Sequence, residues 1–178
     1  MTAQAYRATA LKALTNEIGV YALCDLDEIP IYVGQSTDGI RARVQRHLTS
    51  ARSDVIANRQ IDVWEIAFVW AWPVASRDQI TPLERHLFNR FDASHKLMNG
   101  KTLDAPMQDV AVPEMQRVQV IDEQERLNRL LPDQRLLRQI AQYNTLVDYI
   151  LNVKNADHLK QSLAAHFERL VRYHQRFL

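Results

Sequence analysis

A predicted β-hairpin between Ile18 and Gly34 constrains the fold of this 178-residue chain more than any other stretch. Residues 18–24 and 29–33 are rich in aliphatic and aromatic side chains, and the polar residues 25–28 between them are typical of a turn. Antiparallel pairing of the two runs would bring Tyr21 close to Tyr32. Alone, this pair is best explained by packing on an amphipathic sheet. An arginine-rich segment follows Gly34, however, and gives the two phenols a chemical context.

Composition narrows the class of protein. The chain has no run of about 18 apolar residues, so we expect no transmembrane helix, and residues 1–12 lack the apolar core of a signal peptide. Cys24 is the only cysteine, which excludes a disulfide within the chain and a cysteine-based zinc site. The net charge is +1, so a basic surface for nucleic acid would have to be local. We therefore expect a cytoplasmic protein that does not bind membranes.

A helix is predicted over residues 40–51, after a turn at residues 35–39. One side of this helix consists of Ile40, Val44, His47 and Leu48. Its body contains Arg41, Arg43 and Arg46 and no acidic residue, whereas faces that only confer solubility usually mix both charges. We predict that this helix contacts phosphate, with a solvated basic face as the alternative.

A third strand is predicted over residues 62–72, and Pro73 ends it. Its aromatic residues have even spacings and share one face, which favours core packing over base stacking. Thr81 and Pro82 would begin the next helix as N-cap and first helical residue. Glu84 would then lie in the first turn, so a capping-box role three residues after Thr81 is one explanation of this acid.

Residues 101–116 contain two prolines and are predicted to form an irregular linker, and the chain becomes helical from about Val118. Two apolar stripes with helical spacing follow: Leu136, Ile140, Tyr143, Val147 and Ile150, then Leu159, Leu163, Phe167, Leu170 and Phe177. We expect an αα-hairpin or a three-helix unit whose stripes pack on the core, on a second subunit, or on both. Acids are interleaved with its arginines, so we expect these arginines to lie on a solvated face.

An ordered set of residues resembles the GIY-YIG nuclease family: Gly19-Val20-Tyr21, Tyr32-Val33-Gly34, Arg43, His47, Glu84 and Asn99. Both triplets carry valine where the family commonly has isoleucine. Arg43 matches the family's catalytic arginine, and His47 one turn later is similar to homing endonucleases and small type II restriction enzymes of the family. Glu84 heads a helix after the third strand, where the family keeps its metal-binding glutamate. The resemblance covers about residues 17–100.

The predicted elements and the resemblance together imply an α/β chain of the α+β type. We expect a small three-stranded, mainly antiparallel sheet flanked by helices, with a C-terminal helical extension. The nuclease module would span residues 1–100, with its core at 17–100. A linker at 101–116 would lead to the extension at 117–178, which would serve in dimerisation or as a DNA clamp.

The resemblance also implies roles for single residues. The catalytic residues would be Tyr21, Tyr32, Arg43, His47 and Glu84, and Glu84 would hold Mg²⁺ or Mn²⁺ on the leaving-group side. The substrate-binding residues would be Arg41 and Arg46, from the positive charge of their helix, together with Asn99 and Gln35. Asn99 resembles the asparagine that often closes the family's module, and Gln35 stands where many members have a lysine.

Phosphodiester hydrolysis needs an activated water and stabilisation of charge on the phosphate oxygens. Arg43 would supply a permanent bidentate donor, and Glu84 a single hard oxygen ligand suited to one Mg²⁺. By resemblance Tyr21 deprotonates the water, and Tyr32 would position the water or bind a phosphate oxygen. A free phenol with a pKa of about 10 is only about 0.1% ionised at pH 7, however. His47, four residues after Arg43, could therefore polarise a tyrosine or act as the base itself.

These expectations predict a divalent-metal-dependent endonuclease of restriction or defence type, which hydrolyses duplex DNA and forms a homodimer through its C-terminal helices. A structure-specific repair or nicking nuclease is the alternative within the same enzyme class. The alternative of another class is a non-catalytic nucleic-acid-binding protein that retains the nuclease fold.

Overall fold

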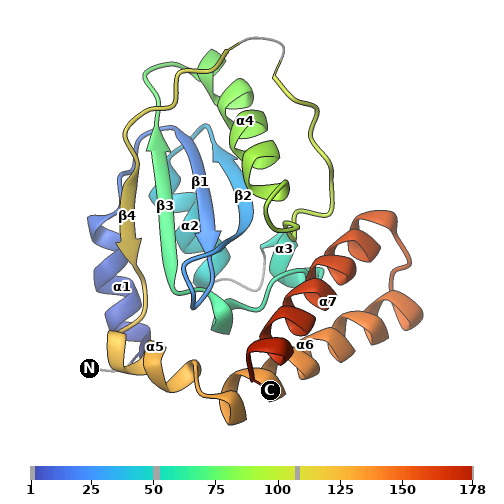
Figure 1. Ribbon diagram of the computed structural model, residues 1–178. Helices are drawn as coiled ribbons and strands as arrows, with labels where there is room; N and C mark the ends of the chain where they lie inside the picture. Colours follow the sequence, from blue (N-terminus) through green and yellow to red (C-terminus); the bar gives the residue numbers. More distant parts are fainter. Residues whose placement is uncertain (1–2, 50–52, 107–108, 178) are drawn as a thin grey trace.

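The computed structural model of the chain describes residues 3–49, 53–106 and 109–177, and its centre is an antiparallel sheet (Figure 1). Along this sheet the order is β2 (Pro30–Ser36), β1 (Gly19–Cys24), β3 (Phe68–Pro73) and β4 (Gln116–Gln119). Every neighbouring pair of strands is antiparallel. Helices surround the sheet, which confirms the α+β class predicted from the sequence.

Asp25 shapes the turn of the predicted hairpin, which is present. Its carboxylate accepts hydrogen bonds from the backbone N–H groups of Asp27 and Ile29, each 2.9 Å long. Glu28 takes a φ of 63°, in the left-handed region that tight turns use. The turn reverses the chain directly after β1, and the resulting register places Tyr21 opposite Gly34.

Alternate residues of β1 contribute to two cores on opposite faces of the sheet. Tyr21 and Leu23 belong to a core that α1 (Ala3–Ala13) and α2 (Ile40–Thr49) cover. Val20 and Ala22 belong to a second core, covered by α4 (Ile80–Asp92). The helix α4 also contacts β2 at the edge of the sheet (Figure 1). Both faces of the hairpin are therefore lined by helices that can bring side chains to it.

The prediction of three strands is wrong, because β4 adds a fourth. It lies at the junction of the predicted linker and helical extension. Its four residues, Gln-Arg-Val-Gln, include one apolar side chain, so no strand pattern marks them in the sequence. Val118 pairs with Val69 of β3, and this pairing covers a strand edge that would otherwise expose unpaired backbone groups.

The predicted start of the third strand is also wrong. Asp62 does not begin a strand but caps the short helix η1 (Val63–Glu65), where its side chain accepts a hydrogen bond from the backbone N–H of Trp64 at 3.1 Å. The strand begins at Phe68 and, as predicted, ends at Pro73. The side-chain cap thus overrides the high strand propensity of Val63 and Trp64.

The helix that carries Glu84 begins earlier than predicted. A short helix, η2 (Arg77–Gln79), leads directly into α4, so Gln79 and not Thr81 is the N-cap. The first turn of α4 contains no acidic residue, and Glu84 lies in the second turn. The capping-box explanation of Glu84 is therefore wrong, and its carboxylate is available for another role.

The C-terminal part forms the predicted three-helix unit, with α5 (Glu123–Arg129), α6 (Pro132–Asn152) and α7 (Asp157–Phe177). Pro132 begins α6 shortly after α5, and α6 and α7 form an antiparallel hairpin beside the sheet (Figure 1). A further short helix, α3 (Asp54–Ala57), follows α2, whose predicted last residues 50 and 51 lie outside the described residues. Among the described residues, no helix combines the length and apolar character needed to cross a membrane.

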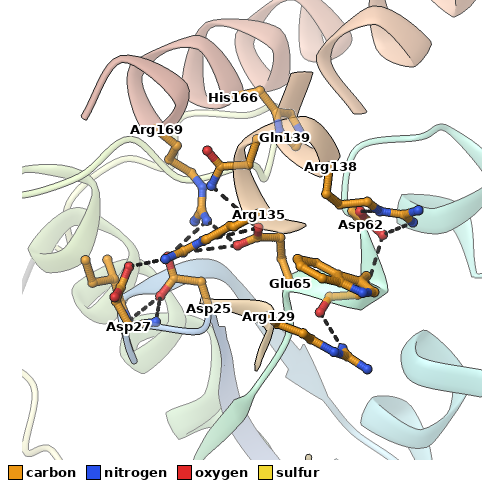
Figure 2. Close-up of polar contacts among 12 residues, drawn as sticks. Asp25, Asp27, Asp62, Glu65, Arg129, Arg135, Arg138, Gln139, His166 and Arg169 are labelled. Carbon is orange, nitrogen blue, oxygen red and sulfur yellow. Dashed lines mark hydrogen bonds and ion pairs between the residues drawn. The ribbon is translucent and has the colours of Figure 1, made fainter. Parts of the chain in front are cut away.

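Buried ion pairs attach the α6–α7 hairpin to the sheet (Figure 2). Arg135 of α6 pairs with Asp27 at 2.5 Å, with Glu65 at 3.2 Å and with Asp25 at 3.3 Å. Arg169 of α7 pairs with Asp25 at 2.9 Å and with Glu65 at 3.0 Å. Only 1% of Arg135 and 7% of Arg169 is exposed. The prediction of a solvated face is wrong for these two arginines, because their partners lie far away in the sequence.

Replacing Arg135 by methionine is expected to lower the free energy of unfolding by about 3–5 kcal/mol, because Asp25 and Glu65 would lose a buried partner. The measurement is urea unfolding followed by circular dichroism. Arg172→Met is the control: Arg172 pairs with Glu168 of the same helix at a partly exposed site, and its loss should cost less than about 1 kcal/mol. An equal decrease in the free energy of unfolding for the two variants would contradict the anchoring role of Arg135.

Candidate active site

Gly34 allows the two hairpin tyrosines to approach each other. A Cβ atom at this position would lie 2.5 Å from the hydroxyl oxygen of Tyr21 and 2.8 Å from Cε1 of Tyr32. Any larger residue would therefore displace both rings. Their centroids are 6.3 Å apart, which confirms the predicted proximity.

His47 joins this pair from α2. Its Nε2 atom lies 2.6 Å from the hydroxyl oxygen of Tyr21, and its ring centroid lies 5.7 Å from that of Tyr32. The side chain is buried, with 3% of its surface exposed. With the imidazole proton on Nδ1, the Tyr21 hydroxyl donates to Nε2. In this tautomer Nε2 is placed to accept the proton of a buried phenol.

Ser53 completes a chain of hydrogen bonds and was not predicted. Its hydroxyl oxygen lies 2.6 Å from Nδ1 of His47, and its side chain is buried. In the tautomer described above, Nδ1–H donates to Ser53, which orients the ring. Ser53 follows the end of α2, six residues after His47. No helical or strand spacing links the two residues, so no sequence signal pointed to this contact.

The Tyr21 hydroxyl is neutral at physiological pH. Burial, and secondarily the nearby Tyr32, raise the pKa of Tyr21 well above that of a free phenol. The charge of Arg43 and its hydrogen bond to Tyr21 act in the opposite direction but do not cancel the effect of burial. An ionised Tyr21 is therefore not the resting form, and Nε2 of His47 lies within hydrogen-bond distance of its hydroxyl.

Arg43 lies one turn before His47 on α2, and its half-buried side chain reaches Tyr21. The structure thus brings together Tyr21, Tyr32, Arg43 and His47, as predicted. Tyr21 and His47 are buried, whereas Tyr32 and Arg43 are only partly buried. A molecule that approaches from solvent would meet Tyr32 and Arg43 first.

Glu84, on α4, influences the tyrosine cluster through its charge. Its charge contributes to raising the pKa of Tyr21. Burial raises the pKa of Glu84 itself to about 6, although the nearby cations Arg85 and Lys101 act to lower it. A half-buried carboxylate with such a pKa is poorly solvated and would gain from a cation.

Glu84 offers a single carboxylate to a cation. Within the described ranges, no three His, Cys, Asp or Glu side chains are grouped so that they could hold an ion together. Mg²⁺ is commonly bound by one or two carboxylates, with substrate phosphate and water completing its shell. Glu84 is thus compatible with Mg²⁺ or Mn²⁺ as a single protein ligand.

The predicted substrate-binding residues of α2 and β2 have different environments. Arg41 donates from Nε to the carbonyl oxygen of Leu14 at 2.6 Å and so ties α2 to the end of α1. Arg46 lies at the surface, where its guanidinium is 3.6 Å from Asp38. Gln35 is exposed at the residue after Gly34. Arg46 and Gln35 remain accessible to a ligand, whereas Arg41 has a structural contact.

Asn99 is bound to the edge of β2 through both ends of its amide group. Its Nδ2 donates to the carbonyl oxygen of Val33 at 2.6 Å, and its Oδ1 accepts from the N–H of Val33 at 3.0 Å. Val33 directly precedes Gly34, so Asn99 fixes the strand at the point where the tyrosines meet. This geometry gives Asn99 a positioning role.

Comparison of the chain with protein-family models, with curated proteins and with solved structures finds no significant match. The geometry of the site is therefore the basis for an assignment of function.

The affinity for a divalent cation is expected to fall below about pH 6, because a proton competes with the metal for Glu84. With a pKa of about 6, the carboxylate is about 10% ionised at pH 5, so Mn²⁺ binding should weaken about tenfold between pH 7 and pH 5. Titration calorimetry with Mn²⁺ measures this change. Glu84→Gln should abolish binding, and Glu168→Gln on α7 is the control. Equal affinity at both pH values would contradict the assignment.

Proposed function

We propose that this chain is a divalent-metal-dependent endonuclease of the GIY-YIG type that hydrolyses phosphodiester bonds of DNA, in a restriction or defence role. The observation that carries the proposal is the 2.6 Å contact between the Tyr21 hydroxyl and His47, next to Arg43. A purely structural tyrosine pair does not need a buried imidazole and a guanidinium at the same point. The order of these residues in the chain, which resembles the family, supports the same assignment.

Arg43 binds the scissile phosphate in this proposal. Its guanidinium stays charged at any physiological pH and offers two parallel N–H donors to phosphate oxygens. Because Arg43 is held beside the buried tyrosine, little reorganisation is needed as negative charge develops. The exposed Arg46 and Gln35 lie on the neighbouring α2 and β2 and would contact the flanking backbone.

Tyr21 and His47 move the proton. The attacking water gives a proton to the Tyr21 oxygen while Tyr21 passes its own proton to Nε2 of His47. This route avoids a free phenolate, which the burial of Tyr21 disfavours. Tyr21 has no exposed surface, so the half-buried Tyr32 or Arg43 must shift when the phosphate binds. In this proposal Nδ1–H of His47 donates to the Ser53 hydroxyl, which leaves Nε2 to accept the proton.

Glu84 would hold the cation. A bound Mg²⁺ supplies Lewis-acid stabilisation of the phosphate and of the leaving oxygen. The cations Arg85 and Lys101 near Glu84 would add to the local positive potential.

The test is cleavage of supercoiled plasmid by the purified protein with Mg²⁺. Wild type should nick or linearise the plasmid, while Arg43→Ala should lower the rate about 10²–10³-fold because one preorganised donor is lost. Glu84→Ala should remove the dependence on the metal together with the activity. The matched controls are Arg172→Ala and Glu168→Ala, an ion pair on α7 outside the site, and these should cleave like wild type.

Cleavage that is equal in wild type, Arg43→Ala and Glu84→Ala would come from a contaminant and contradict the proposal. Tight DNA binding without cleavage under any divalent metal would favour the non-catalytic alternative. A preference for branched or single-stranded substrates over duplex would favour the structure-specific repair or nicking role.

A further inference from the structure

The candidate site lies around the free edge of the sheet. Strand β2 is the outermost strand on this side, and α2 and α4 cover opposite faces of the sheet. Arg43 and His47 come to the site from α2, whereas Glu84 comes from α4. A substrate that contacts both Arg43 and a metal on Glu84 must therefore pass over the edge of β2.

The segment that follows α4 is attached to this edge. The backbone N–H of Met98 donates to the carbonyl oxygen of Ile31 at 2.7 Å, and the amide group of Asn99 makes its two hydrogen bonds to the backbone of Val33. Met98 itself is buried, with 2% of its surface exposed. The chain is thus held against β2 at two successive residues, next to the point where the tyrosines meet.

Gly100 holds the same segment from its other side. Its φ is 71°, in the left-handed region that favours glycine, and a Cβ atom there would lie 2.4 Å from the carbonyl oxygen of His158. The Nε2 atom of Gln60 would lie 2.9 Å from that Cβ, and it donates to the carbonyl oxygen of Asn99 at 3.4 Å. The backbone is therefore fixed directly before Lys101.

Lys101 is the first exposed side chain after this fixed segment. It lies close enough to Glu84 for its charge to act on the pKa of that carboxyl group, which it lowers. Its ammonium group forms no ion pair or hydrogen bond with a residue that the structure describes. The site thus has an accessible cation beside its candidate metal ligand, on a backbone that is held in place.

Arg85 is the other cation near Glu84, but its surroundings differ. It lines a surface pocket together with Asp78 and Asp109, so two acidic side chains share its environment. A phosphate group that approached Arg85 would also approach these carboxylates. Lys101 is therefore the better candidate for contact with a phosphate.

We infer that Lys101 binds a phosphate group of the substrate strand on the Glu84 side of the candidate site. This assignment rests on the proposed function and adds a path for the strand, from Arg43 over the edge of β2 to Lys101. A lysine ammonium suits this task because it attracts phosphate oxygens as a point charge and needs no fixed geometry. The other explanation is that Lys101 only balances the charge of Glu84.

The salt dependence of DNA binding distinguishes these two explanations. A labelled duplex is titrated with the full chain at about 50 to 200 mM NaCl and followed by fluorescence anisotropy, because each phosphate contact contributes about 0.9 to the slope of log K against log salt. EDTA is present to prevent metal-dependent cleavage. Lys101→Ala should lower the slope by about one and weaken binding about three- to tenfold near 100 mM salt, whereas Lys101→Arg should keep the wild-type slope.

Lys96→Ala is the matched control. Lys96 is also exposed and precedes Lys101 by five residues, but its ammonium group pairs with Asp92 at 2.8 Å, so the slope should not change. Both lysines are exposed, and both alanine variants should therefore keep the wild-type circular dichroism spectrum. A slope for Lys101→Ala equal to that of wild type, or a wild-type chain that does not bind the duplex, would overturn the inference.

Cleavage kinetics give a second measurement. With Mg²⁺ and excess protein, Lys101→Ala should raise the protein concentration for half-maximal rate about three- to tenfold and leave the maximal rate unchanged, whereas Arg43→Ala should lower the maximal rate. If no plasmid is cleaved but Lys101→Ala lowers the slope, the phosphate contact stands and the nuclease proposal fails. If cleavage depends on Arg43 and Glu84 while the slope is unchanged, the nuclease proposal stands and the contact fails.

Discussion

Two carboxylates buried at the end of the central strand determine how the C-terminal helices attach. Asp25 uses one oxygen to hold the hairpin turn and the other to bind arginines, while Glu65 approaches from η1. Burying both charges without partners would be costly, so Arg135 and Arg169 must lie at this point. The α6–α7 hairpin consequently presents Arg135 and Arg169 to these carboxylates, and most residues of its apolar stripes stay partly or fully exposed.

The β1–β2 hairpin also supports the candidate site, through residues in the body of its two strands. Gly34 leaves space for Tyr21 and Tyr32, Asn99 holds the adjacent Val33, and α2 delivers His47 to the Tyr21 hydroxyl. The site is therefore built mainly on regular elements, which is the arrangement that preorganises side chains most accurately. The turn that binds the arginines of the C-terminal helices and the tyrosines of the candidate site thus belong to one supersecondary unit, the β1–β2 hairpin.

The parts of the site close in sequence could be predicted, because strand pairing and helical spacing dictate their neighbours. Tyr21 and Tyr32 are linked by hairpin register, and Arg43 and His47 by one helical turn. Contacts made by loops and distant segments left no periodic signal: Ser53 lies beyond the end of α2, and β4 has one apolar residue. The burial of Arg135 could not be predicted either. A helix of mixed charge is expected to be solvated, and the acidic partners of Arg135 lie far away in the sequence.

The most direct test of the central claim is the single-turnover rate of DNA cleavage by wild type and His47→Ala with Mg²⁺, with and without added imidazole. The account predicts that the variant is about 10²–10⁴-fold slower than wild type and that imidazole restores part of the rate. Arg43→Ala, which retains His47, should not respond to imidazole. Cleavage by His47→Ala at the wild-type rate would contradict the proposed proton path through Tyr21 and His47.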